Sequence, residues 1–143
     1  MRIIKQLNST LIAASLIGFA SIANAEIAII VNQDADISRA TQSDVAQLFL
    51  GKRNEIDGEV ARPIDQEEGS ATRTEFYQKV IGKSGAQLNA YWSRLIFTGK
   101  GMPPDKVLDD AEVIEMVSDE SDLVGYVNPS AVDESVKVIL VIP

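Results

Sequence analysis

The side chains best suited to chemistry lie close together in Ile64–Arg73, which reads IDQEEGSATR. Ser70 and Thr72 offer hydroxyl donors, and Arg73 offers a fixed positive charge. An apolar-containing run, Val60–Ile64, leads into this stretch, and a helix-like pattern follows it. A helix start presents unpaired N–H groups and the positive end of the helix dipole, which together favour an anion. The pattern therefore predicts a loop that can hold a small oxyanion such as phosphate.

A second interpretation of the same stretch is purely structural. Ser70 is a residue type that commonly caps a helix, and its polar neighbours would then be solvated surface. The ten residues alone leave both interpretations open, because anion binding is an option at a helix start and not a necessity.

The N-terminus is typical of a secretory signal peptide. Arg2 and Lys5 make a positive start, Leu11–Ala20 is an apolar run, and Ala23–Ala25 fits a small-x-small cleavage pattern. The apolar run is too short for a stable membrane-spanning helix. We therefore expect residues 1–25 to be removed, a periplasmic location, and no direct insertion into the membrane after cleavage.

The remaining residues, 26–143, number 118, which suits a single small domain. They carry 11 basic and 21 acidic residues, a net charge near −10, which argues against nucleic acid and against anionic membrane surfaces. The sequence has no cysteine and no histidine, so typical zinc sites and triads based on either residue are excluded. We expect no cofactor and no enzymatic activity.

Hydrophobic spacing and capping motifs predict alternating strands and helices. The expected strands are residues 28–31, 60–64, 123–127 and 136–142, the last strongly apolar and therefore central or buried on both faces. Pro63 suggests that its strand lies near a sheet edge, or that the proline lies near a strand end. Four helices are expected. The first lies between Thr41 and Gly51, the second runs from Ser70 to Ile81, the third lies between Ser84 and about Thr98, and the fourth starts at Asp109 or Asp110. Trp92, within an apolar helical stripe, is expected in the core. The order predicts an α/β fold, a small mixed β-sheet flanked by helices.

Several segments resemble motifs of the phosphate-binding proteins of phosphate ABC transporters. Asp44–Lys52 (DVAQLFLGK) is similar to a leucine-phenylalanine-x-glycine-lysine segment of that family. Glu68–Phe76 (EGSATRTEF) is similar to its phosphate loop, and Leu123–Val127 (LVGYV) to its isoleucine-glycine-tyrosine strand. Tyr91–Gly99 (YWSRLIFTG) resembles a segment of a short, single-lobe branch.

The resemblance implies one lobe of a type 2 periplasmic-binding-protein fold. It implies that phosphate or a related oxyanion is held by Gln66, Ser70, Ala71, Thr72 and Arg73. Two of these depart from the family pattern, because Gln66 stands where the family has an arginine and Ala71 where it has a glycine. Arg73 is a candidate replacement for that arginine.

Two functions follow from these observations. The first is an extracytoplasmic solute-binding module for phosphate or a related oxyanion, linked to phosphate ABC transport. Since one lobe leaves a ligand half in water, a second copy of the chain or another envelope protein would close the cleft. The alternative is a periplasmic accessory or interaction protein that keeps the lobe and has lost the ligand.

Overall fold

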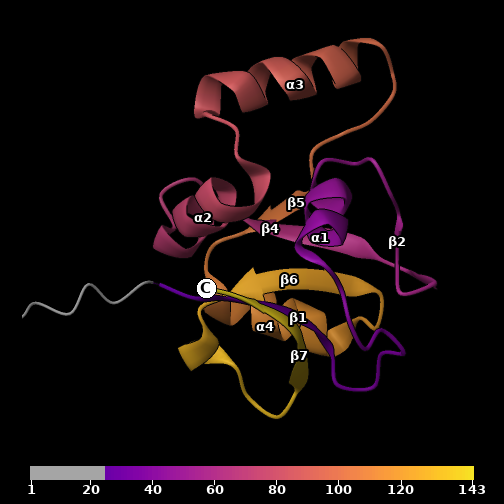
Figure 1. Ribbon diagram of the computed structural model, residues 1–143, viewed down its shortest axis with the longest axis vertical. Helices are drawn as coiled ribbons and strands as arrows, with labels where there is room; N and C mark the ends of the chain where they lie inside the picture. The colour runs from indigo at the N-terminus through magenta and orange to yellow at the C-terminus, as the bar shows by residue number, and fades with distance from the viewer. Residues whose placement is uncertain (1–24) are drawn as a thin grey trace, which may run out of the picture.

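The computed structural model describes residues 25–143, so the predicted signal peptide lies outside the described residues apart from Ala25. Five strands form one sheet in the order β5-β4-β6-β1-β7 (Figure 1). They are β1 (Ile27–Asn32), β4 (Arg62–Gln66), β5 (Asp105–Val107), β6 (Leu123–Val127) and β7 (Val136–Ile142). Strand β1 pairs antiparallel with β6 and β7, whereas β4 pairs parallel with β5 and β6. The predicted small mixed sheet is confirmed.

Helices cover both faces of this sheet (Figure 1). They are α1 (Gln42–Phe49), α2 (Ala71–Phe76) with its π-helical continuation η1 (Tyr77–Ile81), α3 (Gly85–Phe97), α4 (Asp110–Asp119) and the short 3-10 turn η2 (Pro129–Ala131). Strand β1 shows the division of the core, because its side chains alternate between faces. Ile29 belongs to the apolar cluster that contains residues of α1, α2 and α3, while Ile30 belongs to the cluster that contains residues of α4. The chain therefore has two apolar layers with the sheet between them.

Gly125 lets α4 approach the sheet closely. A Cβ atom at Gly125 would lie 2.5 Å from Val113 Cγ1 and 3.1 Å from Ile64 Cγ2. Real Cβ atoms do not approach a neighbour so closely, so a larger residue here would push α4 away from β6. The glycine therefore sets the position of α4, whose first residue is important for the candidate site described below.

The predicted helix boundaries are confirmed at most ends. Thr41 and Ser84 each form a capping box, with Asp44 and Gln87 respectively. Gly51 follows α1 with a left-handed φ of 71°, as expected of a helix C-terminus. Trp92 is 8 % exposed and belongs to the core, as its spacing predicted.

Two expectations about the sheet are wrong. Strand β7 lies at an edge, and Val138 and Val141 are 40 % and 47 % exposed, although its apolar run favoured a central position. The expected strand 60–64 is divided: its start belongs to a short hairpin of β2 (Glu55–Ile56) and β3 (Glu59–Val60), and its end to β4. Strand β4 is internal, with Pro63 near its start, so the strand-end interpretation of Pro63 holds and the edge interpretation does not.

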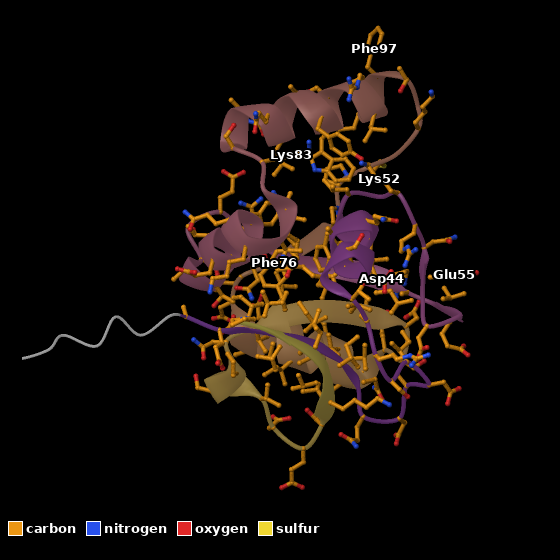
Figure 2. All side chains as sticks on the ribbon, viewed as in Figure 1. Asp44, Lys52, Glu55, Phe76, Lys83 and Phe97 are labelled. Carbon is orange, nitrogen blue, oxygen red and sulfur yellow. The ribbon has the colours of Figure 1, made fainter. Side chains whose placement is uncertain are left out.

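Helix α3 extends away from the sheet at the top of the view (Figure 1). It attaches to the rest of the chain through buried Leu88 and Trp92, and Tyr91 Oη donates a hydrogen bond to Leu50 O at 2.5 Å. Its far end carries Phe97, whose side chain points away from the molecule (Figure 2). Within residues 25–143, no helix combines the length and apolarity needed to cross a membrane.

Candidate functional site

The predicted phosphate loop lies where β4 ends and α2 begins. Ser70 is the N-cap of α2, and its Oγ accepts a hydrogen bond from Arg73 N at 3.2 Å. Gly69 precedes it with a left-handed φ of 98°, which turns the chain from the strand into the helix. As first-turn residues, Ala71 and Thr72 have N–H groups without an acceptor in the helix itself. The structural role predicted for Ser70, that of a helix N-cap, is therefore confirmed.

Gln66 is fully buried at the end of β4, and its side chain is completely hydrogen-bonded. Its Nε2 donates to Tyr126 O at 2.9 Å and to Asp110 Oδ1 at 2.8 Å. Its Oε1 accepts from Ser70 Oγ at 2.5 Å. Gln66 therefore joins β4 to β6, to the Ser70–Thr72 turn and to α4, and its amide donates to a carboxylate.

That carboxylate belongs to Asp110, the first residue of α4. Besides Gln66 Nε2, it accepts hydrogen bonds from Thr72 Oγ1 at 3.2 Å and from Asn128 N at 3.1 Å. Three donors from three separate parts of the chain thus surround one anionic group. We call these donors, from Gln66, Thr72 and Asn128, the donor cradle. The role of Asp110 could not be predicted from the sequence, because 44 residues separate Asp110 from Gln66.

A cavity of about 670 Å³ opens beside the donor cradle. It is lined by Gln66, Ser70, Ala71, Thr72, Leu108, Asp109, Asp110, Ala111, Ile114, Ala131 and Asp133. Four of the five predicted site residues are therefore together at one cavity. Three aspartates line it, and none of its described lining residues is basic, so its field is unfavourable to a doubly charged anion.

Arg73, the fifth predicted residue, points elsewhere. Its guanidinium carbon lies 4.1 Å from the centre of the Tyr77 ring, and its Nε lies 3.7 Å from Asp65 Oδ1. The side chain lines a separate cavity of about 250 Å³, together with Glu68 and Lys106. Its Nε is buried and has no hydrogen-bond acceptor among residues 25–143. The structure thus does not bring Arg73 to the cavity that contains Ser70 and Thr72.

Asp65, which is 1 % exposed, is held by two tyrosine hydroxyls. Tyr77 Oη donates to Asp65 Oδ2 at 2.5 Å, and Tyr126 Oη donates to Asp65 Oδ1. Burial, and then the nearby negative charge of Asp65, raise the pKa of Tyr77 and the pKa of Tyr126 well above their usual range. Gln66 N also donates to Asp65 Oδ1 at 2.8 Å. This buried network fixes the end of β4 from which the donor cradle is built.

No protein-family model and no curated protein matches the sequence. Solved structures do match the fold. A phosphate ABC transporter substrate-binding protein from Clostridium perfringens with bound phosphate superimposes with a TM-score of 0.63 at 19 % identity, over 80 % of this chain and 45 % of that one. An ABC-type phosphate transport receptor from Vibrio cholerae gives 0.63 at 20 % identity, over 80 % and 46 %. PstS from Borrelia burgdorferi gives 0.59 at 15 % identity, over 80 % and 47 %.

The chain therefore has the fold of a part of these phosphate-binding proteins. It spans less than half of the length of each of them. At such low identity the similarity concerns the fold, so what happens at the Ser70–Thr72 turn must be inferred from this chain's own residues.

Proposed function

We propose that this chain is an extracytoplasmic, non-enzymatic module that binds phosphate or a related oxyanion weakly at the Ser70–Thr72 turn. The signal-peptide pattern supports a periplasmic location, as does the likeness to substrate-binding proteins of phosphate ABC transporters. The ligand would contact the Thr72 hydroxyl, the Gln66 amide and the N–H groups of Ala71 and Thr72. Ser70 holds the turn in shape, and Arg73 adds charge from a distance and makes no contact.

The observation that carries this proposal is the donor cradle itself. Gln66 Nε2, Thr72 Oγ1 and Asn128 N converge on two oxygens of one carboxylate, that of Asp110. Donors arranged in this way suit an anionic group, because hydrogen bonds to charged oxygens are about twice as strong as neutral ones. A phosphate oxygen has the same requirement for donors as the carboxylate oxygen that it would replace.

The same arrangement explains why binding should be weak. Asp110 must turn away or share a proton with the incoming oxyanion before the ligand can use the donor cradle. Asp109 and Asp133 add two more negative charges to the cavity wall. Within residues 25–143 the cavity would contact only one side of the ligand, and hydrogen bonds on a side left in water gain little over solvation. We therefore expect a protein that needs a second surface for tight binding.

A thermal-shift titration tests the proposal. A ligand that binds only the folded state at ten times its dissociation constant adds about 1.4 kcal/mol of stability, or a few degrees in Tm. We expect millimolar phosphate to raise the Tm, and the increase to vanish in Ser70→Ala/Thr72→Ala. Thr41→Ala is the matched control, since it removes the N-cap hydroxyl of α1, away from the cavity, and should keep the increase. No shift with any oxyanion would overturn the proposal.

One observation favours the alternative function, a periplasmic accessory protein that binds another protein and no oxyanion. The side-chain donors of Gln66, Ser70 and Thr72 are already engaged within the chain. If phosphate and sulfate both leave the Tm unchanged in the wild type, these contacts serve only to hold the fold together, and this second function is the better one.

A further inference from the structure

The end of α3 and the loop after it form an exposed apolar surface. We call this surface the arm tip and define it by Ile96, Phe97 and Met102, which are 52 %, 93 % and 78 % exposed. Figure 2 shows Phe97 at the outermost end of α3, pointing into solvent. Single exposed apolar residues are common on proteins, but several gathered on one projecting element indicate a contact surface.

We call residues 76–104, which include α3 and the loop after it, the arm, and their charge is opposite to that of the rest of the described chain. Residues 76–104 contain four basic residues, Lys79, Lys83, Arg94 and Lys100, and no acidic one. The remaining residues from 25 to 143 contain 7 basic and 21 acidic residues. The arm is thus a basic projection with an apolar tip, attached to a strongly acidic body.

The cavity beside the donor cradle has the complementary character. Leu108, Ala111, Ile114 and Ala131 give it an apolar wall, and Leu108 is 63 % exposed. Asp109, Asp110 and Asp133 give it negative charge, with no basic side chain among its described lining residues. Its volume of about 670 Å³ exceeds what one phenylalanine side chain needs and lies in the range of ligand pockets.

A single copy of the chain does not bring its own arm tip to this cavity. Figure 1 shows α3 at one end of the longest axis, and the yellow 3-10 turn that borders the cavity through Ala131 near the other end. The arm tip of a second copy is free to approach this cavity from outside. A twofold axis between two copies would allow each arm tip to reach the cavity of the other, so that the same contact forms twice.

We propose that the arm tip of one copy docks into the acidic cavity of a second copy, and that the chain forms a reciprocal dimer. Charge complementarity between Arg94 and Lys100 on the arm and the three aspartates of the cavity favours this occupant and sets the orientation of the contact. The contact blocks access to Thr72 and Asp110. It does not depend on oxyanion binding.

The dimer is expected to be weak and sensitive to salt. A stable interface buries about 800 Å² on each partner, and three apolar side chains with their basic neighbours supply less than that at each contact. The ion pairs lie at the rim of the cavity, where added salt screens them. The chain should therefore pass from monomer to dimer over the micromolar to millimolar range, and more readily at low ionic strength.

Sedimentation velocity with purified protein over that concentration range tests the proposal. Phe97→Ser removes the apolar anchor, and Ala111→Arg fills the cavity and opposes the basic arm. Both variants should remain monomeric where the wild type dimerises. Val60→Ser is the matched control, because Val60 is 61 % exposed on β3 and belongs to neither surface. It should dimerise as the wild type does.

Mixing the two variants gives the sharpest outcome. Ala111→Arg keeps an intact arm tip and Phe97→Ser keeps an intact cavity, so the mixture should form a mixed dimer through one contact although neither variant dimerises alone. A wild type that is monomeric at every concentration would overturn the proposal, as would a Phe97→Ser variant that still dimerises. A third outcome would also overturn the proposal. If a monomeric wild type binds vesicles of phosphatidylethanolamine and phosphatidylglycerol and Phe97→Ser does not, the arm tip contacts a membrane surface and not a second copy.

Discussion

Thr72 Oγ1 lies 3.2 Å from Asp110 Oδ2, and this hydrogen bond joins the start of α2 to the start of α4. The two helices begin at one cavity, so the positive ends of both dipoles approach the same carboxylate. The sequence marks Asp110 only as the beginning of a helix. In the structure, Asp110 accepts hydrogen bonds from the donors that an oxyanion would use. Oxyanion binding at the Ser70–Thr72 turn would depend on how readily Asp110 releases these donors.

Removing the Thr72 hydroxyl should weaken the link between α2 and α4. Thr72→Val keeps the shape of the side chain and leaves Asp110 one donor short, so we expect a loss of about 0.5–1.5 kcal/mol in the free energy of unfolding, measured by urea titration. Thr74→Val is the control on the same helix, since the Thr74 hydroxyl is exposed and bonds only to Ser70 O, at 3.3 Å. In an Asp110→Ala background the effect of Thr72→Val should disappear. An undiminished effect would mean that the hydroxyl acts elsewhere.

The buried tyrosines predict a loss of stability in alkali. Because the pKa of Tyr77 and that of Tyr126 are raised in the folded state, both hydroxyls stay protonated there when the unfolded chain starts to release its tyrosine protons, near pH 10. The contribution of these two hydroxyls to the free energy of unfolding is complete below that pH and declines as the pH rises above it. Tyr77→Phe should therefore lower the stability at neutral pH and flatten the alkaline decline relative to the wild type.

Tyr91→Phe provides the comparison for that experiment. It removes a hydroxyl that donates to Leu50 O and makes no hydrogen bond to Asp65. Denaturant titrations of the wild type and of both variants at pH 8 to 11 measure the decline, and Tyr77→Phe should flatten it. An equal slope for Tyr77→Phe and the wild type would show that the tyrosines around Asp65 do not produce the decline.

Gly125 should not tolerate even one methyl group. Gly125→Ala places a Cβ atom 2.5 Å from Val113 Cγ1, so we expect a loss of about 1–3 kcal/mol from overpacking and a displaced α4. Gly101→Ala is the control, because a Cβ atom there meets nothing within 4 Å. Chemical denaturation measures the difference between the two. Similar stability for both variants would mean that α4 adjusts freely to the sheet.

Arg73 should matter more for the fold than for the ligand. Arg73→Gln removes the cation over the Tyr77 ring and the pairing with Asp65, so the Tm without ligand should fall. Because its side chain lines a different cavity, the phosphate-dependent Tm increase should shrink less than in Thr72→Val. Complete loss of that increase in Arg73→Gln, with the Thr72→Val increase intact, would instead assign the ligand to the cavity beside Arg73.

Local sequence signals predicted the elements and the turn that carries the site. Capping boxes at Thr41 and Ser84 and the cap at Ser70 depend on residues three apart, so the sequence contains the whole signal. The edge position of β7 could not be predicted in this way, because an apolar run has the same appearance in a central strand and in an edge strand. It depends on which strands pair, which is a property of the whole chain.

Asp110, the partner of the Ser70–Thr72 turn, was missed for the same reason. Asp109 and Asp110 are adjacent acidic residues at a helix start, and the sequence gives no sign of which one faces Gln66 and Thr72. Close packing of α4 on β6 at Gly125 brings Asp110 to them. Likewise, the apolar stripe of α3 predicted burial, and its tip is exposed because only the Leu88 and Trp92 side of the helix meets the body.

Isothermal titration of phosphate into three proteins tests the central claim, that Asp110 occupies a donor cradle suited to an oxyanion. Asp110→Ala empties the cradle, whereas Asp133→Ala removes the same charge from the cavity wall without touching the three donors. We predict that Asp110→Ala binds phosphate at least about tenfold more tightly than the wild type, since each hydrogen bond to a charged oxygen contributes about 1.5–3 kcal/mol and tenfold corresponds to about 1.4 kcal/mol. Asp133→Ala should gain much less. Equal affinities for Asp110→Ala and Asp133→Ala, or no phosphate binding by Asp110→Ala, would contradict the claim.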